Sequence, residues 1–173
     1  MDPAPVTRRL FSAQLAALVP LPLLGRVGHG WPVAQQEPGI SRTAESIHQE
    51  VTIKAPLSRI YEALLDERQF AQVTGGQATM IDRNAGGAFS LFGARIKGRN
   101  VELVPNARIV QAWRSEGWEA GVYSIVRFEL KAEGTGTRLV FDHTGFPTGQ
   151  ADHLASGWTT NYWDPLTRFV AGA

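Results

Sequence analysis

The stretch 143–163, HTGFPTGQADHLASGWTTNYW, decides the fold, because a β-strand ends and a long helix begins within it. Phe146 should end the strand, since the proline that follows fixes its own φ and holds the preceding residue in an extended conformation. Beyond Gln150, apolar side chains recur at every fourth position: Leu154, Trp158, Tyr162, Leu166 and Val170. This spacing puts them on one stripe of a helix of about 20 residues, so one face of that helix is predicted to be buried.

Two residues in this region are poor helix formers. Gly157 costs about 1 kcal/mol of helix propensity relative to alanine, so we expect another element to approach the helix closely there. Pro165 cannot donate a hydrogen bond to the carbonyl of Asn161, so we expect a bend at this point. The aromatic residues of the stripe are either ordinary core residues or the wall of a cavity, and the sequence leaves both interpretations open.

The first 34 residues differ in composition from the rest of the chain. They carry the motif TRRLF at 7–11 and the uncharged apolar run 10–24, and they end rich in glycine, proline and small residues. This order is typical of an export signal, and the apolar run is too short to span a bilayer. The paired arginines resemble a twin-arginine signal, which a receptor reads. We expect an export signal at 1–34, a linker at 35–45 and a periplasmic or exported protein, or a cytoplasmic one if this segment is not a signal.

Composition narrows the functions open to the remaining domain. The chain has 17 basic and 16 acidic residues, and removal of residues 1–34, with three arginines and one aspartate, would change the net charge from +1 to −1. A nearly neutral domain argues against a nucleic-acid surface. Without cysteine the chain has no disulfide and no zinc–thiolate site. We expect no metal and no cofactor, since the pairs Asp142-His143 and Asp152-His153 each point their two side chains in different directions.

The rest of the chain predicts an α+β domain that starts near Ser46. Residues 47–53 alternate between apolar and polar side chains as a strand does, and the pattern then becomes helical over 56–66 and again over 67–73. Turn residues separate six further strands, at 78–83, 88–92, 95–104, 109–114, 122–132 and 137–145. Short connections favour antiparallel neighbours, so we expect a curved antiparallel sheet wrapped around the long C-terminal helix, with two short helices after the first strand.

Several short motifs fall in a recognisable order within residues 46–170. They are GGAFSLFG at 86–93, GR at 98–99, ELVP at 102–105, RIVQAWR at 108–114, GTRL at 136–139, HTGFP at 143–147, GW at 157–158 and YW at 162–163. Together they resemble the SRPBCC (START/Bet v 1-like) superfamily, and within it the branch named for the activator of Hsp90 ATPase homologue. The resemblance implies a helix-grip fold, in which the terminal helix is clamped across the sheet, often with a hydrophobic cavity between them. It does not fix a function, because one scaffold hosts unrelated activities.

We expect the domain to bind a hydrophobic small molecule or lipid, without catalysis, in a cavity between the sheet and the C-terminal helix. The expected ligand-binding residues carry aromatic or imidazole side chains: Phe89, Trp113, Phe128, Phe141, His143, Trp158 and Tyr162. A co-chaperone or other protein-binding role, which the branch name suggests, is the first alternative. We expect neither a nucleic-acid partner nor a stable membrane span.

Enzyme chemistry is the second alternative. His143 shares a strand face with Leu139 and Phe141, close to the turn into the helix, and its ordinary pKa near 6.5 suits acid–base work. A polyketide cyclase-like enzyme, of a kind found elsewhere in the superfamily, would use it with an aspartate or tyrosine of the pocket. A structural His143, hydrogen-bonded to backbone in the turn, is the simpler interpretation.

A row of positive charge marks one strand. Arg95, Lys97 and Arg99 alternate along it. Such a row is typical of a solvated sheet face, and contact with an acidic partner is the alternative interpretation.

Overall fold

The computed structural model describes residues 45–172. The expected export signal at 1–34 and all but the last residue of the expected linker at 35–45 lie outside the described residues, so both stay predictions. Within residues 45–172, no helix is both long and apolar enough to cross a membrane.

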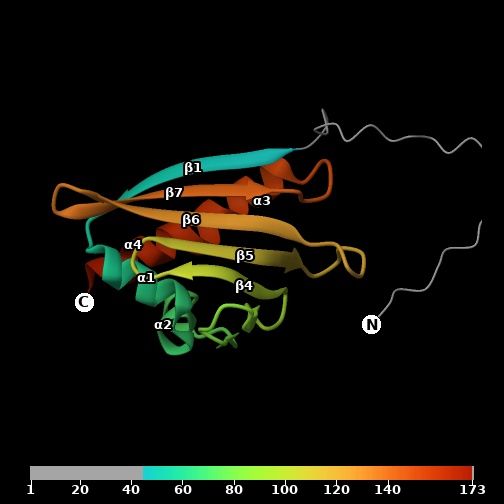
Figure 1. Cartoon of the computed structure of the whole chain (residues 1–173), viewed down its shortest axis with the longest axis horizontal. Coiled ribbons are helices and arrows are strands. Elements are labelled where there is room, and N and C mark those ends of the chain that lie inside the picture. The colour runs from blue at the N-terminus through green and yellow to red at the C-terminus, as the bar shows by residue number, and fades with distance from the viewer. Residues whose placement is uncertain (1–44, 173) are drawn as a thin grey trace, which may run out of the picture. The chain divides into compact units, whose positions relative to one another are not determined.

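The described part of the chain forms seven strands, four α-helices and one π-helical segment (Figure 1). In chain order they are β1 (Ser46–Ile53), α1 (Leu57–Leu65), α2 (Glu67–Val73), β2 (Met80–Ile81), β3 (Ala88–Leu91), β4 (Ile96–Val104), β5 (Arg108–Ser115), β6 (Ser124–Glu133), β7 (Gly136–Thr144), α3 (Ala151–Trp158), the π-helical η1 (Thr159–Trp163) and α4 (Asp164–Ala171).

All seven strands join one antiparallel sheet, in the order β1-β7-β6-β5-β4-β3-β2. Strands β2 to β7 follow one another across it, and β1 pairs with β7 at the opposite edge. The helical region from α3 to α4 runs diagonally behind the sheet, and α1 and α2 lie at one end (Figure 1). The α+β prediction is confirmed, and the arrangement is the helix-grip fold.

Strands β2 and β4 are irregular. β2 is shorter than the predicted strand 78–83, because the Asp82 carboxylate accepts hydrogen bonds from the backbone N–H and side-chain amide of Asn84, at 3.1 and 2.8 Å. Such a local turn competes with strand pairing. β4 is interrupted by a bulge between Asn100 and Glu102, so Val101 has no partner on β5.

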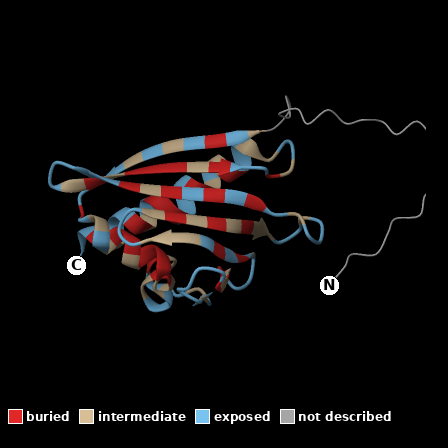
Figure 2. Cartoon of the chain, viewed as in Figure 1, coloured by how far each residue is buried: buried red, intermediate tan, exposed pale blue. Residues whose placement is uncertain are grey.

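The sheet is apolar on its inner face and polar on its outer face, as the period of two requires. On β7, Leu139, Phe141 and His143 are fully buried on the inner face. Buried and exposed positions alternate in the same way along the other strands (Figure 2). The predicted stripe of the C-terminal helical region is confirmed, since all of its members are buried: Leu154, Trp158, Tyr162, Leu166 and Val170.

Polar contacts fasten the helical region to the edge strand β1. Gln49 donates from its side-chain amide to the carbonyl of Ala155 at 3.1 Å, and its Oε1 accepts from the indole N–H of Trp163 at 2.7 Å. One side chain of β1 therefore bonds to two turns of the helical region, one in α3 and one in η1.

The irregularity expected at Pro165 falls one turn earlier, as η1. Pro165 itself lies in the first turn of α4, where a missing N–H is tolerated. A π-helical turn holds more residues than an α-helical turn, so it brings neighbouring residues closer to one face. Tyr162 and Trp163, adjacent in sequence, are both buried as a result.

Candidate functional site

A pocket of about 290 Å³ lies between the sheet and the C-terminal helical region. Its walls come from α3 and η1, from β4 and β5 with the turn that joins β3 to β4, and from the segment between α2 and β2. The lining residues are Gln77, Phe92, Arg95, Ile96, Trp113, Ser115, His153, Leu154, Gly157, Trp158, Asn161 and Tyr162.

Four buried aromatic residues form the floor of this pocket. The ring centroid of Tyr162 lies 4.2 Å from that of Trp158 and 5.3 Å from that of Phe92, and Trp113 lies 5.6 Å from Trp158. From α2, Phe70 packs edge-on against Phe92 and Tyr162. Because each ring is held by others, the floor keeps its shape when no ligand is bound.

Two polar atoms of the floor have no hydrogen-bond partner. The indole Nε1 of Trp113 and the hydroxyl of Tyr162 are buried, and neither bonds to another described residue. Burial raises the pKa of the Tyr162 hydroxyl, and the nearby Trp113 indole partly offsets that rise without reaching hydrogen-bond geometry. Both atoms are covered by protein, so neither opens onto the pocket.

The rim of the pocket is polar. Arg95, His153 and Asn161 are exposed and border the pocket, and Gly157 lies between the last two on the helix. A Cβ built on Gly157 would meet only the side-chain amide nitrogen of Asn161, at 3.8 Å. The prediction that another element approaches the helix closely at Gly157 is therefore wrong. Glycine there leaves this side of the pocket open.

Three of the seven predicted ligand-binding residues line the pocket: Trp113, Trp158 and Tyr162. The other four are buried and do not border it: Phe89, Phe128, Phe141 and His143. Neighbouring rings occupy the space around these four. Phe141 lies 4.4 Å and Phe128 5.9 Å from Trp158, so both support the floor from beneath.

His143 is fully buried within a chain of hydrogen bonds. The indole N–H of Trp158 donates to its Nδ1 at 3.0 Å, so the proton of the neutral ring is on Nε2. That N–H donates to the Ser124 hydroxyl at 2.7 Å, and the hydroxyl donates to the carbonyl of Trp113 at 3.0 Å. Burial lowers the pKa of His143 to about 4. Both ring nitrogens are occupied, so His143 orients Trp158 and has no nitrogen free for proton transfer to a ligand.

The two members of the Asp142-His143 pair face opposite sides of the sheet. Asp142 lies on the outer face, where its carboxylate is 2.7 Å from Nδ1 of His48. Within residues 45–172, no group of three or more histidine, aspartate or glutamate side chains is arranged to hold a metal ion.

Comparison with known proteins identifies the family. Residues 54–171, well over half of the chain, match the family described as activator of Hsp90 ATPase homolog 1-like protein. The chain belongs to this family. The resemblance predicted from the sequence motifs is confirmed.

The curated proteins that this chain matches are much longer than it is. The activator of 90 kDa heat shock protein ATPase homolog of Dictyostelium discoideum is 31% identical over 107 residues, which cover 61% of this chain and 28% of the relative. Homolog 1 of Homo sapiens is 22% identical over 107 residues, which cover 62% of this chain and 31% of the relative. The chain thus spans between 28% and 38% of the length of the curated relatives it matches.

Several solved structures share the fold of this chain. An HSP90 activator from Plasmodium falciparum superposes with a TM-score of 0.69 at 24% identity, over 73% of this chain and 96% of that one. CalU16 from Micromonospora echinospora superposes with a TM-score of 0.64 at 26% identity, over 74% and 77% of the two chains. The helix-grip fold therefore occurs in bacterial and eukaryotic relatives.

Several residues that line the pocket were not predicted from the sequence, and one signal could have revealed three of them. His153, Gly157 and Asn161 recur at every fourth position, each one residue before a member of the buried stripe. Residues one position before a buried stripe lie at the edge of the buried face of the helix, so they are placed to line a pocket beside it. Phe92 gave no such signal, because its place on the floor depends on a turn with a left-handed φ of 54°.

Proposed function

We propose that this protein binds one small, mainly apolar organic molecule in the pocket between the sheet and the C-terminal helix. The observation that carries the proposal is the pocket of about 290 Å³ itself, which has a floor of four aromatic rings and has Arg95 and His153 at its rim. A ligand with a carboxylate or carbonyl oxygen would place its apolar part on the aromatic floor and its acceptor at the rim, where Arg95 can donate.

The energetics favour occupancy of this site. Covering apolar surface of the aromatic floor is worth about 25 cal/mol per Å². A hydrogen bond from the charged Arg95 guanidinium to a ligand oxygen would add to this gain and would favour ligands that carry an acceptor over plain hydrocarbons.

Size and charge narrow the class of ligand further. A volume of about 290 Å³ lies at the lower end of the range for small-molecule pockets, so the ligand is a compact ring system or a short acyl segment. Arg95 and His153 stand at the rim, and within residues 45–172 no carboxylate lies within 4 Å of either side chain. An aromatic or aliphatic carboxylate meets all of these conditions.

Filling the mouth of the pocket tests the proposal. We expect Gly157→Leu to weaken binding of anilinonaphthalene sulfonate, an apolar anionic probe, by at least about tenfold, or ~1.4 kcal/mol. The new side chain would occupy the open space that Gly157 leaves. Leucine forms helix better than glycine by about 1 kcal/mol, so the loss would not reflect unfolding. Titration of probe fluorescence against protein gives the dissociation constant.

Ser156→Leu is the matched control. Ser156 is exposed on the same helix and does not line the pocket. We expect it to change the dissociation constant by less than about twofold, as surface substitutions usually do. Equal binding by Gly157→Leu and the unmodified protein would contradict the proposal, as would equal losses in both variants. If the two variants behave as expected, native mass spectrometry of protein from its own host would identify the natural ligand.

Removal of the Tyr162 hydroxyl is expected to stabilise the free protein. In Tyr162→Phe the buried hydroxyl that lacks a partner is gone, so the free energy of unfolding should rise by about 1 kcal/mol. Urea denaturation measures this change. Tyr61→Phe is the control, because the Tyr61 hydroxyl is not a buried group without a partner, and we expect less than about 0.5 kcal/mol there. A loss of stability in Tyr162→Phe would show that the hydroxyl is already satisfied.

Binding to a chaperone is the second candidate function. The observation that favours it is the family match over residues 54–171. An unchanged ATPase rate of purified Hsp90 in the presence of excess protein would rule it out. We further propose that residues 1–34 direct export, in which case the mature protein would not meet a cytoplasmic chaperone, and the small-molecule function is favoured for that reason.

A further inference from the structure

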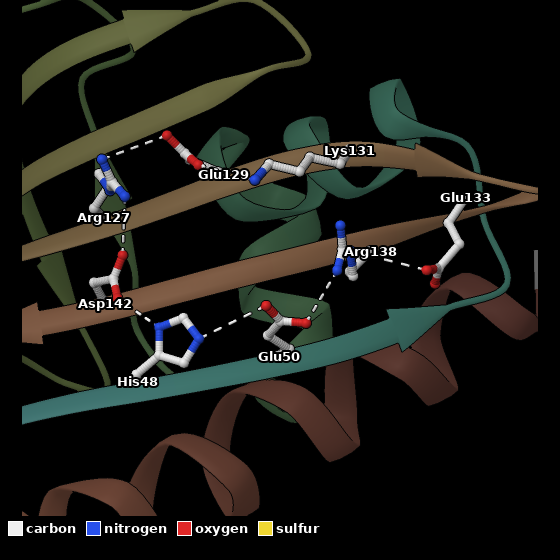
Figure 3. A network of polar contacts seen from close by, with 8 residues as sticks. All are labelled: His48, Glu50, Arg127, Glu129, Lys131, Glu133, Arg138 and Asp142. Atoms are coloured by element: carbon white, nitrogen blue, oxygen red, sulfur yellow. Dashed lines mark hydrogen bonds and ion pairs between the residues drawn. The ribbon is translucent and has the colours of Figure 1, made fainter.

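The outer face of the sheet divides into two halves that differ in how their charges are paired. On β1, β6 and β7, eight charged or titratable residues form one network of ion pairs: His48, Glu50, Arg127, Glu129, Lys131, Glu133, Arg138 and Asp142 (Figure 3). Each cation of this half has a carboxylate within 4 Å. Asp142, for example, lies 3.1 Å from Arg127 and 2.7 Å from His48. The charges in this half of the outer face are therefore paired with one another.

The other half also contains one ion pair, Glu102 with Arg108 at 2.7 Å, but three of its cations have no such partner. Lys97 of β4 lies directly opposite Arg114 of β5, and Arg99 is the next outward residue of β4; we call these three the basic row. Within residues 45–172, no carboxylate lies within 4 Å of any of them. Arg99 and Arg114 donate only to backbone carbonyls, those of Gly86 and Trp118.

Like charges in directly opposed positions destabilise a sheet by roughly 0.2–1 kcal/mol. In the paired half, Arg127 and Asp142 occupy directly opposed positions on β6 and β7 and attract each other. In the basic row, Lys97 and Arg114 occupy such positions and repel each other. A hollow of about 110 Å³ lies beside them, lined by both cations and by Glu116, whose carboxylate is more than 4 Å from either cation. Solubility does not require two like charges in directly opposed positions. A bound anionic group would offset the repulsion between Lys97 and Arg114.

Exposed apolar side chains flank the basic row. Ile125 of β6 stands in the same cross-strand line as Arg99, with Ala112 between them, and it is 45% exposed. Tyr123, just before β6, is 50% exposed. Arginine with exposed aromatic and aliphatic side chains is typical of protein interfaces. A nucleic-acid surface would need more clustered cations than three.

We propose that the basic row, together with Ile125 and Tyr123, binds an acidic segment of another protein in an extended conformation. Lys97 and Arg99 are two residues apart on one strand, so their side chains emerge about 6.8 Å apart. Glutamates at alternate positions of an extended peptide have the same spacing and would face them, while an apolar residue of the peptide covers Ile125. This surface lies on the face of the sheet opposite the pocket, so the inference stands independently of the small-molecule function.

Charge reversal in the full-length protein tests this inference. The probe is a short fluorescein-labelled peptide in which glutamates alternate with threonines around a central leucine, and binding is followed by fluorescence anisotropy. We expect the unmodified protein to bind it, more weakly as salt is raised, and the double variant Lys97→Glu/Arg99→Glu to bind at least about tenfold more weakly. The control Lys131→Glu/Arg138→Glu makes the same charge change in the paired half and should weaken binding by less than about threefold.

The outcomes separate the alternatives. A peptide with glutamine in place of glutamate should not bind, and Ile125→Asp should weaken binding of the acidic peptide. If Lys97→Glu/Arg99→Glu fails to fold by circular dichroism, Lys97→Gln/Arg99→Gln replaces it, with a loss of at least about fivefold expected. No binding by the unmodified protein, equal losses in the two charge-reversal variants, or tighter binding of a single-stranded oligonucleotide of equal charge would each overturn the inference.

Discussion

Replacement of Trp158 by alanine is expected to lower the free energy of unfolding by about 5 kcal/mol or more, which approaches the whole stability of a domain of this size. Trp158 is 2% exposed and packs against several aromatic rings, with Tyr162 at 4.2 Å and Phe141 at 4.4 Å. Truncation leaves a large cavity and also removes the donor that satisfies Nδ1 of His143. Urea denaturation followed by circular dichroism measures the loss.

Two variants separate the contributions of Trp158. Trp158→Phe keeps most of the ring volume but removes the N–H, so it should cost about 1–3 kcal/mol for the unpaired nitrogen of His143. Trp118→Ala removes a partly exposed indole that contacts Trp113 at 5.5 Å, and we expect a loss of about 1 kcal/mol. A loss below about 2 kcal/mol in Trp158→Ala would contradict the view that this residue anchors the helical region to the sheet.

The fold could be predicted because each element carries its own signal. The four-residue period from Leu154 to Val170 required a helix with one buried face, and the alternation of Leu139, Phe141 and His143 with polar residues required a strand facing it. These signals depend only on neighbours along the chain. The pairing of β1 with β7 could not be predicted in this way, since it joins Ser46 to a residue almost a hundred positions away.

The site could be predicted only in part, because a pocket is defined by space that side chains do not fill. The sequence shows that Phe89, Phe128 and Phe141 face inward, but their rings meet one another or Gly98 and leave no room for a ligand there. The open space lies further along the helix, where Gly157 contributes no side chain. That outcome depends on the distances between elements, which periodicity does not give.

Acid is expected to destabilise the protein through His143, with a loss of about 3 kcal/mol between pH 6.5 and pH 4. Burial lowers the pKa of His143 from 6.5 to about 4 in the folded state. Between pH 6.5 and pH 4, His143 is therefore protonated in the unfolded chain and neutral in the folded chain. The contribution is complete above pH 6.5 and disappears as the pH falls toward 4. At 1.36 kcal/mol per pKa unit, the shift corresponds to the stated loss.

His143→Gln removes this titration and should flatten the dependence of unfolding free energy on pH across that window, while lowering stability at pH 7 by about 1–3 kcal/mol because the two internal hydrogen bonds change. His48→Gln is the control, because the contribution of His48 to stability depends on pH in the opposite direction. The carboxylate of Asp142 raises the pKa of exposed His48, so its contribution is present in acid and is lost as the pH rises. Urea denaturation between about pH 4.5 and 7 compares the three proteins. An equally steep loss in His143→Gln and the unmodified protein would mean that His143 is not the group that charges, and that the bond from Trp158 to its Nδ1 does not hold the ring neutral.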